Sequence, residues 1–446
     1  MRSTLFLPCP AGVEPFLADE TARLAPAAGV RAGRGGVSLQ GDLALAMRLN
    51  LESRLAGRVL LEVASGAYRS EHDLYDLARR VDWRQWIGPE QTLRVDTTSQ
   101  RSPLRSLHFA GLRVKDGVCD QFREALGRRP DVDLARPDLP LLLHCGPERA
   151  ILYVDTSGEP LFKRGWRADT GDAPLKETLA AALLAAAGWE GRPDAGGALL
   201  DPCCGSGTIA IEAAQIACGI APGANALRRF AFERLLPFRE PALRDVWQAL
   251  KAEAAARVHA PAVPVFASDV SFRMVDFARR NAERAGVAHA IEFHGGDALE
   301  RPAPALPETL PGTVVVNPPY GERLEPAGAG SGRVRQVRMS GELRESAEDR
   351  GTPDDFFSRL ASHWKKAFTA HSAGWTAWVL SPDRRLERTM RLKASRRVPL
   401  WNGPIECRLF GFTLVAGSAR TGLDGLGAHA AAAPSPGSPA APPSPR

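Results

Sequence analysis

The segment Leu199-Leu200-Asp201-Pro202-Cys203-Cys204-Gly205-Ser206-Gly207-Thr208 decides the fold of the larger part of this 446-residue chain. A short apolar strand runs into a Gly-Ser-Gly turn, and a helix-forming run follows. Gly205 and Gly207 permit positive φ and let a ligand approach the backbone, and the N–H groups that open a helix attract a carboxylate or a phosphate. Neither GxGxxG nor GK[ST] is present, which disfavours dinucleotide and P-loop sites. A tight turn without a ligand is the alternative interpretation.

Strands and helices alternate on both sides of this segment, from residue 175 to residue 415. The pattern predicts helices at 175–187, 208–217, 272–285 and 356–368. It predicts strands at 198–200, 263–268, 291–294, 312–316, 374–380 and 408–415. Apolar strands in regular alternation with helices are typical of a doubly wound, mostly parallel α/β sheet.

Two acidic residues follow later strands of this predicted sheet. Asp269 stands at the end of the strand at 263–268, where an acid can accept both hydroxyls of a ribose. Asp269 and Ser271 are also good caps for the helix that follows. Asp297, in the run HGGDA, could receive an exocyclic amine or could serve as a turn residue. Both interpretations stay open for each acid.

A third signal is Val314-Val315-Val316-Asn317-Pro318-Pro319-Tyr320-Gly321. The two prolines fix the backbone and cannot donate, so a backbone carbonyl stays free as an acceptor. The side-chain oxygen of Asn317 and the carbonyl of Pro318 then suit an sp² amino group, which has two N–H donors. Tyr320 offers a stacking surface for a flat base. The alternative is a rigid loop with an incidental aromatic residue.

The composition fits large apolar cores and is compatible with a polyanionic partner. Hydrophobic residues make up 44% of the chain, which excludes global disorder. The net charge is +6, and 50 of the 57 Lys and Arg residues are Arg. This excess reflects either a GC-rich coding bias or a preference for the phosphate-binding fork of Arg.

The seven cysteines are scattered without a CxxC pair, so we expect no zinc or other metal site and no disulfide scaffold. No apolar run reaches the roughly 18–20 residues of a membrane-spanning helix. The apolar start of the chain is too short for a secretory signal. We therefore expect a cytoplasmic protein with no membrane partner.

Two regions outside the predicted sheet differ in composition. Residues 1–160 contain short strands and helices without Gly-rich phosphate loops, which indicates small α+β modules. Strands are predicted there at 4–7, 58–64, 92–97, 141–145 and 149–155, and helices at 15–24, 44–49 and 73–81. Residues 417–446 are rich in Ala, Pro, Ser and Gly, and we expect a disordered tail because they bury too little apolar surface to fold.

The DPCCGSG turn, Asp269, Asp297 and NPPY, in this order, resemble the class I S-adenosylmethionine-dependent methyltransferases that methylate nitrogen. FKRGWR at 162–167 and APLKETLAA at 173–181 resemble the linker and first helix of the THUMP-domain RNA guanine-N2 methyltransferases. CPAGVEPFLADE, near the start, and LWNGPIECRLF, near the end, resemble the same family. Its nearest group is the bacterial 23S rRNA guanine-N2 methyltransferases with a single methyltransferase domain.

The resemblance implies a Rossmann-like methyltransferase domain at 161–416, a ferredoxin-like module at 1–60 and a THUMP RNA-binding module at 61–160. It implies S-adenosylmethionine as cofactor, with no metal. The implied cofactor-binding residues are Asp201, Pro202, Cys203, Gly205, Ser206 and Gly207 for the methionine part, Asp269 for the ribose, and Asp297 and Ala298 for the adenine. The implied clamp for the target amine is Asn317, Pro318, Pro319 and Tyr320.

The implied reaction is methylation of the exocyclic N2 of a guanine in structured RNA, with large-subunit rRNA or its precursor as partner. We expect RNA contacts from basic residues of the linker, with Trp166 packing beside them, and from a basic segment after the strand at 374–380. The residues are Lys163, Arg164, Arg167, Arg384, Arg385, Arg388 and Arg391. For the second group, a solvated Arg-rich helix is the alternative.

Some choices stay open. Residues 325–351 form an insertion that the family usually lacks, which is either a lid, an RNA contact or a solvated insert. The same amine clamp also fits a tRNA guanine-N2, an adenine-N6 or a protein glutamine methyltransferase. A non-enzymatic alternative is an rRNA-binding assembly factor that keeps the fold.

Overall fold

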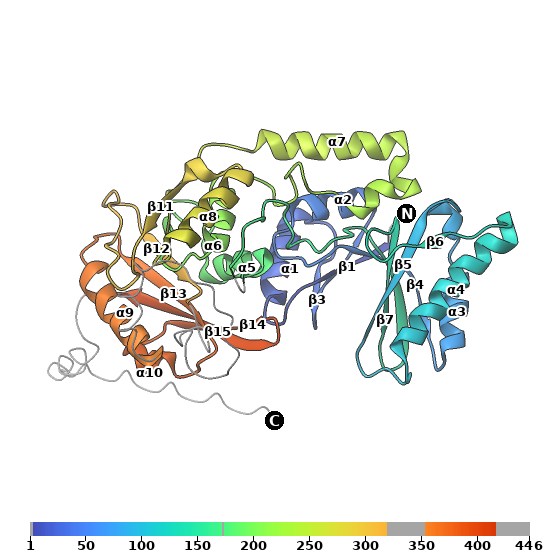
Figure 1. Ribbon diagram of the computed structural model, residues 1–446, viewed down its shortest axis with the longest axis horizontal. Helices are drawn as coiled ribbons and strands as arrows, with labels where there is room; N and C mark the ends of the chain where they lie inside the picture. The colour runs from blue at the N-terminus through green and yellow to red at the C-terminus, as the bar shows by residue number, and fades with distance from the viewer. Residues whose placement is uncertain (1–2, 172–173, 319–352, 416–446) are drawn as a thin grey trace, which may run out of the picture.

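The computed structural model describes residues 3–171, 174–318 and 353–415, which form two β-sheets (Figure 1). Pro319, Tyr320, the insertion at 325–351 and the tail at 417–446 lie outside the described residues. The eight-stranded first sheet has the order β2-β3-β1-β4-β8-β7-β5-β6, and the seven-stranded second sheet has the order β11-β10-β9-β12-β13-β15-β14. The fold therefore has an N-terminal half and a C-terminal half, each built on its own sheet.

The first sheet joins two α+β modules through one shared strand. β4 pairs antiparallel with β1 at Leu5↔Leu61 and Phe6↔Leu60, and it pairs antiparallel with β8 along its other edge. Leu5 and Leu61 are buried in the same core. The strands are β1 Ser3–Pro8, β2 Arg31–Gly33, β3 Gly36–Gly41, β4 Leu60–Ala67, β5 Thr92–Ser99, β6 Asp131–Val132, β7 Leu139–Cys145 and β8 Arg149–Asp155.

Four helices and one short turn accompany this sheet. They are α1 Glu14–Leu24, α2 Leu43–Glu52, α3 Glu71–Arg79, the 3₁₀ turn η1 Trp83–Gln85 and α4 Leu107–Leu126. α4 is a helix that the sequence patterns did not predict, because Gly111 and Gly117 interrupt its apolar stripe. Both glycines are buried and permit close packing, since a Cβ at Gly117 would lie 2.9 Å from the backbone oxygen of Tyr75 on α3.

The second sheet is mostly parallel, as predicted. β11, β10, β9, β12 and β13 run parallel, and β15 and β14 complete the sheet as an antiparallel hairpin. Its strands are β9 Ala198–Asp201, β10 Val265–Asp269, β11 Ile291–Gly295, β12 Gly312–Val316, β13 Trp375–Ser381, β14 Arg396–Asn402 and β15 Ile405–Leu414. β12 has the predicted bounds.

The helices of this half are α5 Glu177–Ala187, α6 Thr208–Ala217, α7 Pro241–Ala256, α8 Phe272–Arg284, α9 Pro353–Ala367 and α10 Leu386–Met390. Short 3₁₀ turns lie at η2 Ala231–Arg234, η3 Leu236–Arg239 and η4 Ala288–Ala290. Neighbouring residues of β9 face opposite sides of the sheet, as strand geometry requires: Leu199 packs in the larger core and Leu200 in the smaller one. Both faces are therefore buried, which explains the continuous apolar runs.

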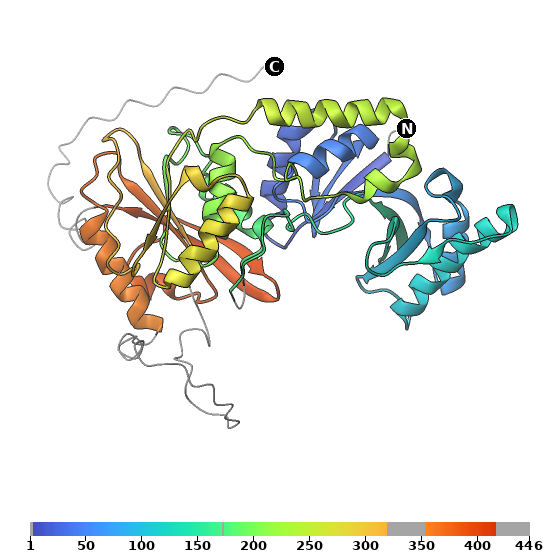
Figure 2. The same cartoon turned by 45° about the horizontal axis from the view of Figure 1, so that its top comes forward.

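α7 joins the two halves of the molecule. It lies along α2 in both views (Figures 1 and 2), and ion pairs connect Arg48 of α2 to Glu253 (3.0 Å) and Arg257 to Glu52 of α2 (2.8 Å). The sequence patterns did not predict this helix. Within the described ranges, no helix is both long and apolar enough to cross a bilayer.

Candidate active site

The predicted site residues gather at the carboxyl edge of the second sheet. Asp201 ends β9, Asp269 ends β10, Asp297 follows β11 and Asn317 follows β12. β10, β9 and β12 are direct neighbours, and β11 pairs with β10. Ligands of open α/β sheets bind outside the carboxyl ends of the strands, so the topology brings four residues from four distant segments to one candidate site.

The loop between β9 and α6 is shaped for close approach to its backbone. Gly205 and Gly207 have φ of +52° and +89°. A Cβ at Gly207 would lie 2.8 Å from the Cβ of Ala278, whereas a Cβ at Gly205 would meet nothing within 4 Å. α6 begins without a side-chain cap, so its first N–H groups remain available to an anion.

Asp269 holds this loop against the neighbouring strand. Its Oδ2 accepts a hydrogen bond from the N–H of Gly205 (2.9 Å), and its Oδ1 accepts one from the N–H of Ser271 (2.9 Å). Ser271 occupies the N-cap position of α8, as predicted, but its side chain makes no capping hydrogen bond. Each carboxylate oxygen still has acceptor capacity for a ligand.

Asp201 is a buried acid without a cation. Its side chain is 1% exposed, and its Oδ1 accepts a hydrogen bond from the N–H of Cys203 (3.3 Å). Burial raises the pKa of Asp201 well above its usual 3.8, and the charge of Asp269 raises it further. Within the described part of the chain, Asp201, Asp269 and Asp297 form no ion pair. The site therefore favours a ligand that carries positive charge.

The two cysteines of the loop are not suited to nucleophilic chemistry. Burial raises the pKa of the Cys203 and Cys204 thiols well above 9.0, and nearby aspartates raise it further. Both thiols stay protonated at neutral pH, and the thiolate is the reactive form of cysteine.

Asn317 presents an acceptor that the protein leaves unused. Its Oδ1 is buried and accepts no hydrogen bond from any residue that the structure describes. Pro318 beside it is buried. An unsatisfied buried acceptor costs about 1–3 kcal/mol, and a ligand N–H would remove that cost. Among the described residues, the Asp297 side chain makes one local turn contact, in which its Oδ1 accepts from the N–H of Leu299 (2.9 Å).

Phe272, the first residue of α8, was not predicted as a site residue. Its side chain is 76% exposed. A Cβ at Gly295 would lie 2.3 Å from its ring, so the glycine lets the ring lie across the end of β11. An apolar residue at the exposed start of a helix was the available signal.

Two further residues attach the linker that follows β8 to the loop between β9 and α6, which we call the cofactor-type loop. Asn281 on α8 is fully buried; its Nδ2 donates to the backbone oxygens of Ser206 (3.0 Å) and Asp169 (2.8 Å). Arg167 donates to the Ser206 hydroxyl (3.1 Å) and the Thr208 hydroxyl (2.8 Å), and pairs with Glu177 (2.8 Å). These hydrogen bonds hold the loop between β9 and α6 against the linker.

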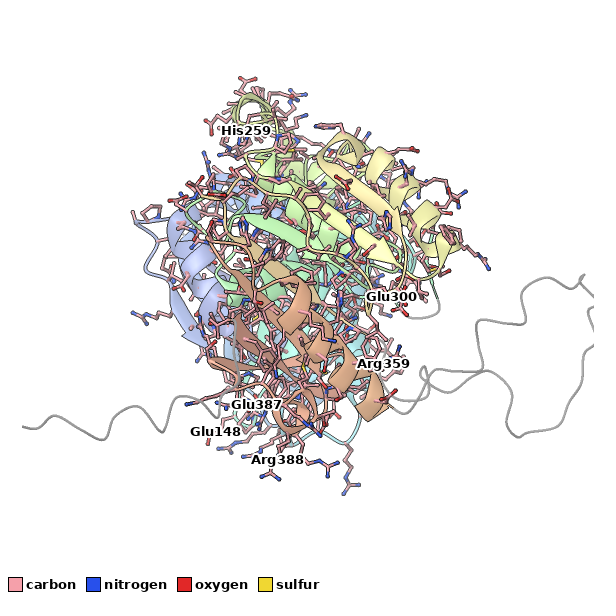
Figure 3. The ribbon with its side chains drawn as sticks, turned by 90° about the vertical axis from the view of Figure 1, so that its left-hand side faces the viewer. Glu148, His259, Glu300, Arg359, Glu387 and Arg388 are labelled. Carbon is pink, nitrogen blue, oxygen red and sulfur yellow. The ribbon has the colours of Figure 1, made fainter. Side chains whose placement is uncertain are left out.

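The predicted RNA contacts divide into two groups. Arg164 is 2% exposed and pairs with the buried Glu212 (3.0 Å), so its predicted RNA contact is wrong. Arg167 is partly buried and makes internal contacts to Glu177, Ser206 and Thr208, and its predicted RNA contact stays a prediction. Trp166 is buried, as predicted. The exposed residues are Lys163, Arg384, Arg385, Arg388 and Arg391, and Figure 3 shows Arg388 at the rim of the molecule.

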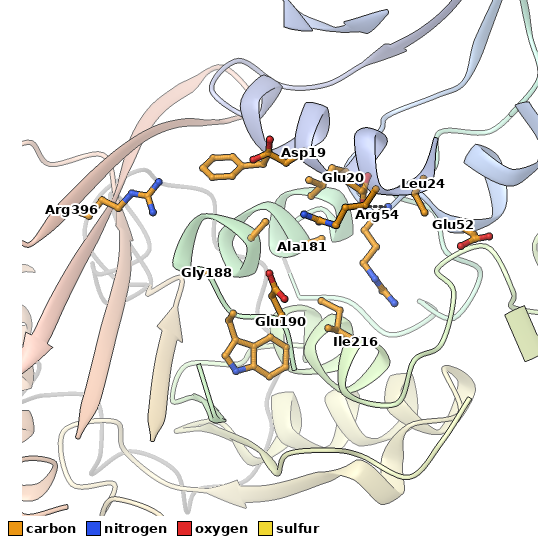
Figure 4. Close-up of a pocket in the computed structure, with 15 residues that line it drawn as sticks. Asp19, Glu20, Leu24, Glu52, Arg54, Ala181, Gly188, Glu190, Ile216 and Arg396 are labelled. Carbon is orange, nitrogen blue, oxygen red and sulfur yellow. Dashed lines mark hydrogen bonds between the residues drawn. The ribbon is translucent and has the colours of Figure 1, made fainter. Parts of the chain in front are cut away.

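A cavity of about 500 Å³ between α1, α2 and α5 is a separate feature (Figure 4). Gly188 and Glu190, which precede β9, and Ile216 at the end of α6 line it, so it lies toward the amino ends of the strands. Its buried Glu20 already accepts from the Ser53 hydroxyl (2.7 Å) and the N–H of Arg54 (2.9 Å). No candidate residue of the strand-end site lines this cavity.

Comparison with known families gives the domains. Residues 164–336 match the RMKL-like methyltransferase domain, residues 68–155 the THUMP domain, and residues 4–60 the RlmL ferredoxin-like domain. The chain carries a THUMP domain and a methyltransferase domain. The expected fold class is confirmed, because the methyltransferase domain contains the mostly parallel sheet and the other two domains share the first sheet.

Relatives of known name cover nearly the whole chain. It is 37% identical over 417 residues to the ribosomal RNA large subunit methyltransferase K/L of Methylococcus capsulatus, a match that spans 93% of this chain and 52% of the relative. The protein of that name from Syntrophotalea carbinolica is 38% identical over 414 residues, spanning 92% and 53%. The chain therefore spans about half the length of these curated relatives.

A solved structure supports the same fold. A protein described as a methyltransferase, in complex with S-adenosylhomocysteine, superposes with a TM-score of 0.75 at 25% identity, covering 93% of this chain and 98% of that chain. In the ranges that the structure describes, no group of three or more His, Cys, Asp and Glu could hold a metal ion.

Proposed function

We propose that this chain is an S-adenosylmethionine-dependent methyltransferase that methylates the exocyclic N2 of a guanine in structured RNA, with 23S rRNA as the substrate. The observation that carries the proposal is the buried, unused oxygen of Asn317 beside the acidic strand-end site. The names of the large-subunit rRNA methyltransferase relatives support the choice of RNA. Such an enzyme would meet its rRNA partner in the cytoplasm.

The strand-end residues fit S-adenosylmethionine. The open backbone at Gly205 and the uncapped start of α6 suit the methionine carboxylate. Asp201, together with Asp269, favours the positive ammonium and sulfonium groups, and Asp269 also suits the ribose hydroxyls. Asp297 and Ala298 are assigned to the adenine. When bound, the cofactor supplies a methyl group on a sulfonium, which is a good leaving group.

The protein's task is to orient a poor nucleophile. The lone pair of the guanine amine is delocalised into the ring, and two acceptors, the Asn317 oxygen and the Pro318 carbonyl, would turn the nitrogen toward a tetrahedral geometry. The same acceptors stabilise the positive charge that develops on nitrogen. Alignment of this kind contributes up to roughly 7–11 kcal/mol. Stacking on Tyr320, with Pro319 fixing the loop, would add about 1–3 kcal/mol for an extruded base.

The test offers S-adenosylmethionine with a labelled methyl group to naked large-subunit rRNA, tRNA, DNA and a protein extract. Label in 2-methylguanosine of the rRNA, identified by nucleoside mass spectrometry, is the expected result. Label confined to tRNA, to adenine in DNA or to protein glutamine would support the corresponding alternative. RNA binding without any label would support an assembly factor.

The variant Asn317→Ala separates catalysis from cofactor binding. Because the Asn317 oxygen contacts the target amine in this proposal and not the cofactor, we expect turnover to fall by at least about 100-fold, the range for loss of one preorganised polar contact. S-adenosylmethionine affinity, measured by calorimetry, should not change. An equal loss of affinity and of rate would contradict the assignment.

A further inference from the structure

Two adjoining cavities lie where the THUMP domain, the linker and the methyltransferase domain meet. The first has a volume of about 470 Å³, and the second about 430 Å³. They share Glu159, Lys163 and Leu227 in their walls, so they lie side by side. We refer to these two cavities as the basic groove.

The first cavity is lined by six cationic side chains and one acid, Glu159. The cations are Arg58, Arg94, Arg136, Lys163, Arg229 and Arg234. They come from both domains, because Arg94 and Arg136 belong to the THUMP half whereas Arg229 and Arg234 belong to the methyltransferase half. A wall of one charge sign in a concave surface concentrates the electrostatic potential and attracts anions.

Four of these six cations already form ion pairs with acidic residues. Arg58 pairs with Asp155, Arg94 with Asp96 (2.8 Å), Lys163 with Glu159 (2.9 Å) and Arg234 with Asp138 (3.5 Å).

Arg136 and Arg229 are exposed, and neither forms an ion pair with a described residue. Arg229 is nevertheless held in place, since it donates to the backbone oxygens of Ala226 (2.9 Å) and Arg228 (3.2 Å). Each wall of the groove thus offers one guanidinium without a direct ion pair, although Arg136 is still attracted by the nearby carboxylates of Asp133 and Glu159.

The groove also has apolar surface between its charges. Leu227 is 72% exposed and lines both cavities. Phe162 lines the second cavity, with the ammonium of Lys176 5.1 Å above its ring. Cations interleaved with flat or apolar surface suit single-stranded nucleic acid, whose phosphates and bases need both.

The second cavity points toward the strand-end site. Arg167 forms part of its wall, and the same guanidinium contacts Ser206 and Thr208 of the loop after β9. We propose that the basic groove holds the phosphodiester backbone of a single-stranded RNA segment that runs from the THUMP domain to the target guanine. This inference rests on the proposed function, because it requires an RNA substrate.

The experiment uses the double variant Arg136→Gln/Arg229→Gln, with Arg244→Gln as the matched control. Arg244 is an exposed arginine of α7 that lines neither cavity and forms no ion pair with a described residue. The full chain is titrated with a fluorescently labelled single-stranded oligouridine over a range of salt concentrations. Because each phosphate contact contributes about 0.7 to the slope of log K against log salt for single strands, the double variant should lose about 1.4 from that slope.

Three readouts decide the outcome. An unchanged slope in the double variant, or the same change in the control, would overturn the groove. Preference of the wild-type chain for duplex RNA, with no effect of the two substitutions on oligouridine, would overturn it as well. If oligouridine binding depends on both arginines but no substrate is methylated, the result supports RNA binding in the basic groove and contradicts the proposed methylation reaction.

Discussion

Replacement of Arg167 by methionine tests whether the linker supports the cofactor-type loop. The guanidinium lies 2.8 Å from Glu177, 3.1 Å from the Ser206 hydroxyl and 2.8 Å from the Thr208 hydroxyl. The Glu177 side chain is 3% exposed, and removal of one partner from a buried ion pair costs about 3–5 kcal/mol. Two lost hydrogen bonds to the loop, at about 0.5–1.5 kcal/mol each, loosen it by about 1–3 kcal/mol.

The two effects separate in different assays. Chemical denaturation reports the loss of stability, and calorimetric titration with S-adenosylmethionine reports the state of the loop. Since binding must reorder the loosened loop, about 1–3 kcal/mol corresponds to roughly 5- to 150-fold weaker binding.

Arg164→Met is the matched control for Arg167→Met. Arg164 pairs with the fully buried Glu212 (3.0 Å) but makes no hydrogen bond to residues 205–208. It should retain its affinity for S-adenosylmethionine and lose less stability than Arg167→Met, because Arg54 still pairs with Glu212 (3.4 Å). The double variant Arg167→Met/Glu177→Gln lacks the unpaired buried carboxylate of Glu177. Its stability should therefore recover in part, whereas its affinity for S-adenosylmethionine should stay low. Equal affinity in both single variants would refute the reasoning.

Two further predictions concern the strand-end site. Because burial raises the folded-state pKa of Asp201 above 3.8, the stabilisation from its protonated form is present below about pH 3.8 and is lost as pH rises through the raised pKa. Asp201→Asn should therefore raise the thermal midpoint of the ligand-free chain increasingly toward neutral pH while it weakens S-adenosylmethionine binding; a pH-independent difference would contradict this. Gly207→Ala should destabilise the chain more than Gly205→Ala, because only the former places a Cβ 2.8 Å from Ala278. Both substitutions place an alanine at positive φ, which costs about 1 kcal/mol of stability relative to glycine. Equal thermal midpoints for the two variants would argue against a packing role for Gly207.

The parts of the fold that follow local rules were predictable. β12 matches its predicted bounds because a run of valines between Gly312 and Asn317 has only one favourable structure. α4 was missed because its apolar stripe contains two glycines, whose use becomes clear only when β5 packs against Gly111 and α3 packs against Gly117. The continuous sheet through β4 was also beyond reach, since strand pairing between modules leaves no local pattern.

The candidate site divides in the same way. Asp201, Asp269 and Asn317 stand at strand ends, and the position of a strand end is legible in sequence. The role of Arg164 was misread because its partner Glu212 lies 48 positions further along the chain. The local sequence around an arginine in a linker does not indicate whether its side chain is buried. The domain boundaries at residues 60, 160 and 416 and the ligand contacts of the site remain predictions.

The shared strand β4 has a mechanical consequence. Because β4 pairs with β1 on one edge and with β8 on the other, the ferredoxin-like and THUMP domains cannot swivel past each other without breaking backbone hydrogen bonds. α7 then braces that unit against the methyltransferase half, and so does Arg54, which pairs with the buried Glu212 (3.4 Å) and accepts a hydrogen bond from Arg164 at its backbone oxygen (2.7 Å). In the proposed function, this rigid connection would fix the distance between an RNA held by the THUMP domain and the strand-end site, and that distance would select the nucleotide presented for methylation.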